Sequence, residues 1–185
     1  MSRIHLVDPT EASGEAKELL DAVQNQLGST PNFLRALASS PPALAGVLEF
    51  NSHLARGRLD AATRERIALA VSESNGCEYC VSAHSALAAG AGLNSDEIDA
   101  ARRGGSADKQ ADAAVKFARA LLDHQGDVTT GEIDAVRAVG YGDAEIVEII
   151  ALVGMNVLTN FLGKAGRIDV DFPKIALLAE PVAVG

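Results

Sequence analysis

Apolar residues recur along this chain at spacings of three and four, with polar residues between them. This period is typical of amphipathic helices, and no stretch shows the sustained alternation of β-branched or aromatic residues with polar ones that indicates strands. Glycines, prolines and capping residues such as Asp60 separate the segments. The sequence therefore predicts an all-α fold with helices over residues 11–27, 32–38, 41–56, 61–74, 77–90, 96–102, 109–124, 132–139 and 143–164.

Two segments depart from this amphipathic pattern. Residues 146–162 (IVEIIALVGMNVLTNFL) are apolar on nearly all sides, which predicts a helix buried on every face. A central core helix and a helix at a subunit interface both fit, and the sequence leaves the two open. The tail, residues 168–185, contains Pro173 and Pro181, and we expect irregular or partly helical packing there.

Length and composition indicate a single domain over residues 1–185. The length falls within the range of about 100–200 residues for one domain, and a hydrophobic content of 48% is enough for one core. No window approaches the roughly 18 uninterrupted apolar residues of a membrane span. Residues 1–9 also lack the apolar stretch of a secretory signal. We therefore expect a cytoplasmic protein without a membrane partner.

The chain is acidic, with a formal net charge of −9 and a pI near 4.8. Proteins bind phosphate backbones through clustered Lys and Arg residues that displace counterions, and this chain lacks such clusters. We therefore expect no nucleic-acid partner.

The only two cysteines, Cys77 and Cys80, form a C-x-x-C pair at the predicted start of a helix, and His84 follows one turn after Cys80. On a helix these offsets bring both sulfurs and the imidazole to one face. Unpaired N–H groups and the positive end of the helix dipole favour thiolate there, and His84 can accept or return the proton. The spacing predicts thiol–disulfide chemistry, in which one thiolate attacks an oxidant and the other thiol captures the sulfenic acid as a disulfide.

Two other interpretations of the cysteine pair are open. Free cysteines are often buried, so the two could simply pack in an apolar helix. Cys77, Cys80, His84 and Glu65 could also ligate zinc, but structural zinc sites usually take two ligand pairs from separate segments. The sequence has no second Cys or His pair, so we expect neither a metal nor a cofactor.

The pattern Glu65-x11-Cys77-x2-Cys80-x3-His84, within the run RERIALAVSESNGCEYCVSAHS, closely resembles the core motif of the AhpD-like (carboxymuconolactone decarboxylase) family. It is most similar to the peroxidase-related, alkylhydroperoxidase-like subgroup, over residues 64–90. A weaker similarity covers residues 156–173, which include Asn160 and end in IDVDFP.

This resemblance implies an AhpD-like helical bundle that assembles as trimers or hexamers. It implies reduction of hydrogen peroxide or alkyl hydroperoxides, with an unidentified thiol or dithiol as reductant. In this family the second cysteine, here Cys80, attacks the peroxide and the first, here Cys77, resolves the product, while His84 and Glu65 form a proton relay. Helix electrostatics alone would give the lower pKa to the cysteine nearest the helix start, Cys77. We follow the resemblance because His84 is closest to Cys80.

Two further positions keep two interpretations each. Glu65 lies on the preceding helix, so its carboxylate could reach His84, or it could be an ordinary first-turn glutamate paired with Arg64 or Arg66. Ser72 could hydrogen-bond within the site or to its own helix.

The remaining candidates are assigned structural roles. Tyr79 stands where some family members carry a second histidine, so this chain lacks the imidazole that a relay step through that position would use. With an ordinary pKa of about 10, Tyr79 is expected to pack against a neighbour or a second subunit rather than act as an acid. His5, His53 and His124 lie outside the motif, and we expect surface or structural positions for them.

Three competing functions remain open. A disulfide oxidoreductase would use the same residues with an oxidant that is not a peroxide. A non-catalytic, redox-sensing helical oligomer would change its assembly on oxidation without turnover. The ring-lactone decarboxylases that give the wider family its name generally lack the cysteine pair, so Cys77 and Cys80 count against that activity.

Overall fold

The computed structural model describes residues 1–178 and contains, over that range, nine helices and no strand. The predicted all-α fold is confirmed, and the largest error in a helix end is at the first helix, predicted to begin at Glu11 and observed to begin at Gly14. The helices are α1 (Gly14–Leu27), α2 (Asn32–Leu37), α3 (Pro41–Ala55), α4 (Ala61–Ser74), α5 (Glu78–Gly90), α6 (Ser95–Arg102), α7 (Lys109–Asp123), α8 (Thr130–Ala138) and α9 (Asp143–Gly166).

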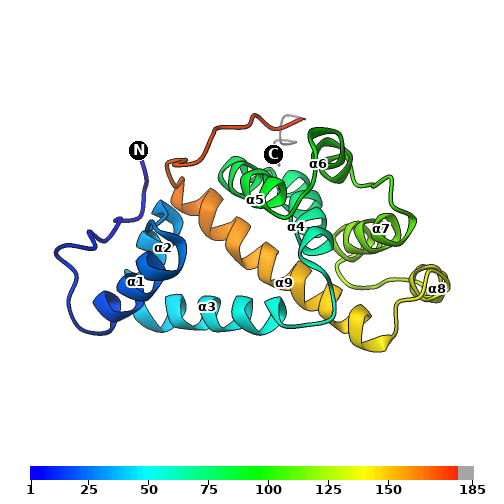
Figure 1. Ribbon diagram of the computed structural model, residues 1–185, viewed down its shortest axis with the longest axis horizontal. Coiled ribbons are helices and arrows are strands. Elements are labelled where there is room, and N and C mark those ends of the chain that lie inside the picture. The colour runs from blue at the N-terminus through cyan, green and yellow to red at the C-terminus, as the bar shows by residue number, and fades with distance from the viewer. Residues whose placement is uncertain (179–185) are drawn as a thin grey trace.

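Helix α4 is the centre of the bundle and packs against α5, α6, α7 and α9 (Figure 1). Asp60 caps its first turn by accepting a hydrogen bond from the N–H of Thr63 at 2.8 Å. Its apolar residues Ile67, Leu69 and Val71 are fully buried. Helices α1 and α2 lie at one end of the molecule, and α7 and α8 lie at the other.

A tight turn joins α4 to α5. Gly76 adopts a left-handed conformation with φ 63°, which residues with a side chain rarely adopt. Cys77 follows as the N-cap of α5. The turn therefore places the first cysteine at the start of α5, against the last turn of α4.

Helix α9 passes through the middle of the molecule and contacts α3, α4, α5 and α7 (Figure 1). Within residues 1–178 it is also the one helix long and apolar enough to cross a membrane, and this packing accounts for the apolar residues on its inner face. Its outer face carries an exposed apolar row: Val147, Ile150, Leu158 and Phe161. The prediction that this segment is buried on every face is therefore wrong for the single chain.

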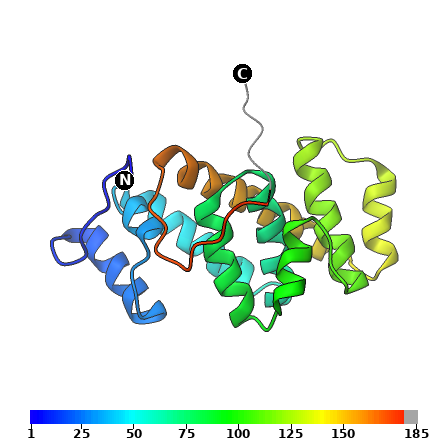
Figure 2. The same ribbon diagram turned by 90° about the horizontal axis from the view of Figure 1, so that it is seen from above.

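Residues 168–178, here called the strap, follow α9 without helical structure and cross α5 (Figure 2). The N–H of Ile175 donates to the hydroxyl of Ser82 on α5 at 3.0 Å, and Lys174 forms a 3.2 Å ion pair with Glu78. The expectation of irregular packing is confirmed for this part of the tail. Its continuation, residues 179–185, lies outside the described residues.

Candidate active site

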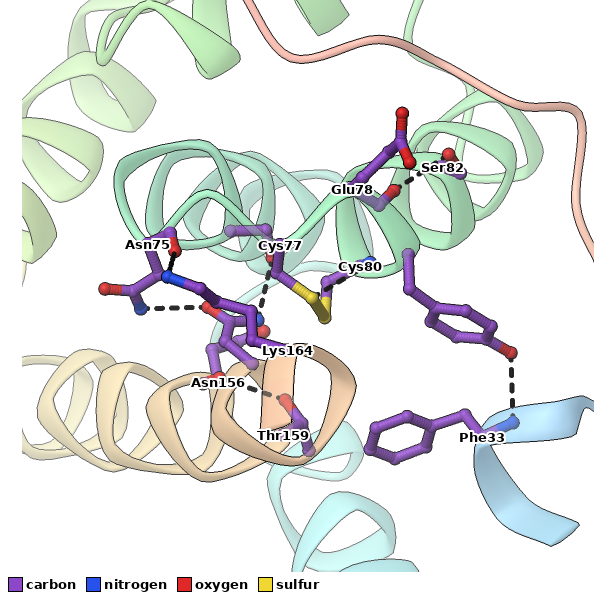
Figure 3. The surroundings of a disulfide bond; sticks show 12 residues. Phe33, Asn75, Cys77, Glu78, Cys80, Ser82, Asn156, Thr159 and Lys164 are labelled. Atoms are coloured by element: carbon purple, nitrogen blue, oxygen red, sulfur yellow. Dashed lines mark hydrogen bonds between the residues drawn. A yellow bond between two sulfur atoms is a disulfide. The ribbon is translucent and has the colours of Figure 1, made fainter. Parts of the chain in front are cut away.

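Cys77 and Cys80 are joined by a disulfide at the start of α5, on the side that faces α9 (Figure 3). Both residues are buried, with exposed fractions of 1% and 4%. The sulfur of Cys77 accepts a hydrogen bond from the N–H of Cys80 at 3.3 Å, so it takes up one of the unpaired backbone donors of the first turn. The two sulfurs thus lie in a dry position with a backbone donor directed at one of them.

The backbone of α9 closes one side of the disulfide at Gly163. A Cβ atom on Gly163 would lie 2.8 Å from the sulfur of Cys77 and 3.4 Å from that of Cys80. A side chain at this position would displace the sulfurs, so the close packing of α9 on the cysteine pair requires glycine.

A buried polar network fixes the turn that precedes Cys77. The side-chain amide of Asn160, which is fully buried, donates to the hydroxyl of Ser72 at 3.2 Å and accepts from the amide of Asn75 at 2.9 Å. The C=O of Ser72 accepts the N–H of Cys77 at 3.0 Å. Lys164 donates to the C=O of Asn75 at 2.5 Å (Figure 3). Ser72 therefore bonds to α9 beside the site, as one of its two interpretations proposed.

His84 and Glu65 are paired across the two helices, with 2.8 Å between Nδ1 of the imidazole and Oε2 of the carboxylate. An ionised carboxylate can only accept, so this contact requires the proton on Nδ1 and leaves Nε2 to exchange protons with other groups. The side chains are 22% and 20% exposed, which keeps the pair in contact with solvent at the edge of a buried site.

The alternative interpretation of Glu65, a partner for its neighbouring arginines, is wrong. Arg66 pairs with Glu97 at 2.9 Å, and Arg64 donates to the backbone C=O of Leu59. Within residues 1–178, His84 makes no hydrogen bond to either sulfur. The structure thus brings Glu65 to His84, which lies one turn after Cys80 on the same helix.

Tyr79 packs beside the disulfide, as expected from the sequence. Its ring lies 5.7 Å from that of Phe33 and 5.9 Å from that of Phe172, measured between ring centroids. Its hydroxyl donates to Asp171 at 2.8 Å and accepts the N–H of Phe33 at 3.2 Å. Burial raises the pKa of Tyr79 well above its ordinary value, so the hydroxyl stays protonated.

The other histidines lie away from this site, on the surface as expected. His5, His53 and His124 are exposed. His53 contacts Arg56 at 3.0 Å, and His124 lies 3.6 Å from Glu132. No group of three or more His, Cys, Asp and Glu side chains that could hold a metal ion occurs within the described part of the chain.

Sequence reasoning missed several residues that shape the site. Gly163 belongs to no sequence motif, and the need for glycine at this position follows only from the packing of α9 on α5. Phe33 lies far from the motif in sequence and reaches it through the fold. Asn160 and Asp171 did carry a signal, since both fall in the C-terminal stretch that shares the weaker similarity.

The fold and the site together define an all-α protein with a buried C-x-x-C disulfide beside a Glu–His pair. The model of the carboxymuconolactone decarboxylase family matches residues 41–123, which run from α3 to α7 and include all four motif residues. Residues 41–123 are therefore similar to this family. A comparison with curated proteins found no significant match.

Solved structures share the fold over nearly the whole chain. An AhpD-core, uncharacterized peroxidase-related protein from Ralstonia eutropha JMP134 is 22% identical, with 92% of each chain covered and a TM-score of 0.84. A peroxidase-related protein from Silicibacter sp. TM1040 is 23% identical, with 91% of each covered and a TM-score of 0.79. A variant of the debrominase Bmp8 in complex with 2,3,4-tribromopyrrole is 20% identical, with 92% of this chain and 94% of that chain covered and a TM-score of 0.76. The fold is therefore AhpD-like.

Proposed function

We propose that this protein is a thiol-dependent peroxidase that reduces hydrogen peroxide or alkyl hydroperoxides through Cys77 and Cys80. The observation that carries the proposal is the buried disulfide at the start of α5, one helical turn before an imidazole that a carboxylate orients. Similarity to structures described as peroxidase-related supports the same function.

In the proposed cycle the Cys80 thiolate attacks the distal peroxide oxygen, which breaks the O–O bond and yields Cys80 sulfenic acid and an alkoxide. His84 supplies the proton that converts the alkoxide to an alcohol. The Cys77 thiolate then attacks the sulfur of Cys80, forms the disulfide and releases hydroxide, which takes a second proton to become water. An external thiol or dithiol restores both cysteines. Two thiols are oxidised for each peroxide reduced to alcohol and water.

Local geometry supports these separate roles. His84 is one turn after Cys80, while the sulfur of Cys77 accepts the N–H of Cys80 and lies at the helix start. The backbone donor and the helix dipole favour Cys77 as a thiolate ready to attack, which suits a resolving cysteine. Glu65 holds Nδ1 of His84, so Nε2 is the nitrogen that exchanges protons with Cys80.

The test is peroxide consumption in the presence of dithiothreitol by the wild type, Cys80→Ser and Cys77→Ser. We expect turnover by the wild type and loss of turnover in Cys80→Ser. Cys77→Ser should turn over more slowly than the wild type, because dithiothreitol must then reduce the Cys80 sulfenic acid directly. If the wild type consumed peroxide no faster than Cys80→Ser, the proposed function would be wrong.

The same assay separates the competing functions. Faster oxidation of the dithiol form by a small-molecule disulfide than by peroxide would favour a disulfide oxidoreductase. Oxidation that changes the assembly by light scattering, without turnover of either oxidant, would favour a redox sensor.

We propose in addition that the protein is a homo-oligomer in which a second copy covers the outer face of α9. Val147, Ile150, Leu158 and Phe161 are between 46% and 62% exposed, and they form one row of about 21 Å at the rise of an α-helix. Open space surrounds Gly154 in the same row, so two helices could approach closely there. The row is uncharged although the chain carries a net charge of −9, so contact through this face places no like charges directly against each other.

Light scattering tests the oligomer. The wild type should be larger than a monomer, and Leu158→Lys should shift it toward the monomer because a buried ammonium would be unpaired. The control is Leu87→Lys, at an exposed leucine on α5, which should leave the mass unchanged. A monomeric wild type would contradict the proposal.

A further inference from the structure

Almost none of the cysteine pair is exposed to solvent in the described structure. Cys77 and Cys80 are only 1% and 4% exposed. An oxidant molecule must nevertheless reach one of the two sulfurs. The backbone of α9 at Gly163 closes one side, where even an added methyl group would come within 2.8 Å of a sulfur. Because α9 and α5 belong to the packed core, the path must open where the covering segment is not helical.

The first part of the strap, residues 168–172, is such a segment. Ile168, Val170 and Phe172 pack into the apolar cluster that contains both cysteines. The two residues between them, Asp169 and Asp171, are exposed and carry the polar contacts of the segment. This alternation accounts for the sequence IDVDF: the apolar side chains pack into the cluster that contains the cysteines, and the carboxylates hold the segment in place.

The carboxylates bind three different parts of the chain. Asp171 accepts from the hydroxyl of Tyr79 at 2.8 Å and from the N–H of Asn32 at 2.7 Å. Asp169 accepts from the N–H and the hydroxyl of Ser2 at 2.9 and 3.1 Å. These bonds lie at exposed or half-buried positions, so water can replace them when the cover moves, and no helix has to unwind.

Tyr79 links this cover to the cysteines. It stands between Cys77 and Cys80 in sequence, its ring lies between those of Phe33 and Phe172, and its hydroxyl holds Asp171. The rings of Phe33, Tyr79 and Phe172 thus form an aromatic wall beside the disulfide.

We infer that residues 168–172 are a movable cover of the cysteine pair, fastened by the Tyr79–Asp171 bond, and that Phe172 and Phe33 select the oxidant by its apolar surface. The part of the inference that concerns selection of an oxidant rests on the proposed function. The cover itself does not depend on that function, because it limits access of any reagent to the reduced cysteines.

Alkylation tests the cover without any peroxide. The reduced protein is mixed with N-ethylmaleimide, and the rate of labelling at Cys77 and Cys80 is followed by mass spectrometry. Tyr79→Phe keeps the ring and removes the hydroxyl, and Asp171→Asn removes the charged acceptor. Each should speed labelling by about tenfold, the size expected for loss of a charge-assisted hydrogen bond.

Asp8→Asn is the control, because Asp8 binds Thr10 in the N-terminal segment and makes no contact with the strap. Its labelling rate should match that of the wild type. Unchanged rates in both Tyr79→Phe and Asp171→Asn, with native helical circular dichroism, would overturn the inference. Asp171→Asn decides the outcome if Tyr79→Phe does not fold.

Selection is tested by the ratio of rates with cumene hydroperoxide and hydrogen peroxide. Phe172→Ala should lower this ratio, mainly through a higher KM for cumene hydroperoxide, while Phe50→Ala, at an exposed ring on α3, should leave it unchanged. An unchanged ratio in Phe172→Ala would contradict the selective role. If the wild type reduced neither peroxide, the proposed function would fail while the alkylation rates would still decide whether the cover exists.

Discussion

The α4–α5 pair and the strap both lie against the disulfide, but different forces hold them in place. Helices α4 and α5 are fixed by repeated backbone hydrogen bonds and by fully buried apolar residues such as Ile67 and Val81. The strap has no such repeat and depends on single side-chain acceptors, chiefly Asp169 and Asp171. A rigid pair suits groups that must meet at fixed distances, and a weakly fastened segment suits a cover that must move.

This difference predicts that substitutions in the two regions will have different effects. Substitutions in and under the helical pair should change the rate of the chemistry or the free energy of unfolding. Substitutions in the strap should change access to the sulfurs and leave stability nearly unaltered. The following predictions test the first half, from the largest expected effect to the smallest.

Glu65→Gln should slow peroxide reduction about 10- to 100-fold, by analogy with the loss seen when the group that orients a metal-bound histidine is changed. The amide keeps the shape of the side chain but removes the charge that holds the proton on Nδ1 of His84. The measurement is the rate of thiol oxidation in a single turnover. Glu97→Gln is the control, since that carboxylate pairs with Arg66, and it should leave the rate unchanged. Equal rates in Glu65→Gln and the wild type would remove the relay from the mechanism.

Gly163→Ala should lower the free energy of unfolding of the oxidised protein by about 1–3 kcal/mol, because the added methyl group overlaps the sulfur of Cys77. Gly46→Ala, in α3 with open space around the new methyl group, should raise it by about 0.5–1 kcal/mol. Urea unfolding monitored by circular dichroism measures both. Stabilisation by both alanines would show that α9 does not press on the disulfide.

Asp60→Ala should lower the free energy of unfolding at neutral pH by about 1 kcal/mol through loss of the cap of α4. Burial alone would raise the pKa of Asp60, but hydrogen bonds from the N–H and hydroxyl of Thr63 outweigh it and lower the pKa. A lowered pKa in the folded state means that the charged cap stabilises above the unfolded pKa and is lost as the pH falls through the folded pKa.

The difference between the wild type and Asp60→Ala should therefore shrink between pH 7 and pH 3. Asp60→Asn keeps an acceptor at the cap without a titrating group, so its difference from Asp60→Ala should stay nearly constant. A gap between the wild type and Asp60→Ala that is the same at both pH values would contradict the role of the charge.

The same difference between the two regions explains what the sequence predicted. The helices and the grouping of Cys77, Cys80 and His84 follow from local period and spacing, which need no knowledge of the fold. The contact of Glu65 with His84 depends on how two helices pack, and only the resemblance to a family pointed to it. The Tyr79–Asp171 bond joins residues far apart in sequence, so no local pattern could predict it.

Helix α9 shows the limit most clearly. Its apolar composition predicted burial on every face. Hydrophobicity indicates that a helix surface is covered, but it does not show whether the same chain or a second copy covers it. In the single chain, the inner face packs on α4 and α5 while Leu158 and Phe161 remain exposed. The requirement for glycine at position 163 is likewise a property of the assembled helices.

The most direct test of the central claim is to locate the sulfur that peroxide oxidises. Cys77→Ser and Cys80→Ser are each treated with one equivalent of peroxide in the presence of a sulfenic-acid trap, and the labelled residue is identified by mass spectrometry. The proposed mechanism predicts label on Cys80 in Cys77→Ser and little on Cys77 in Cys80→Ser. Label on Cys77 alone would reverse the two roles, and no label in either variant would contradict peroxide chemistry at this pair.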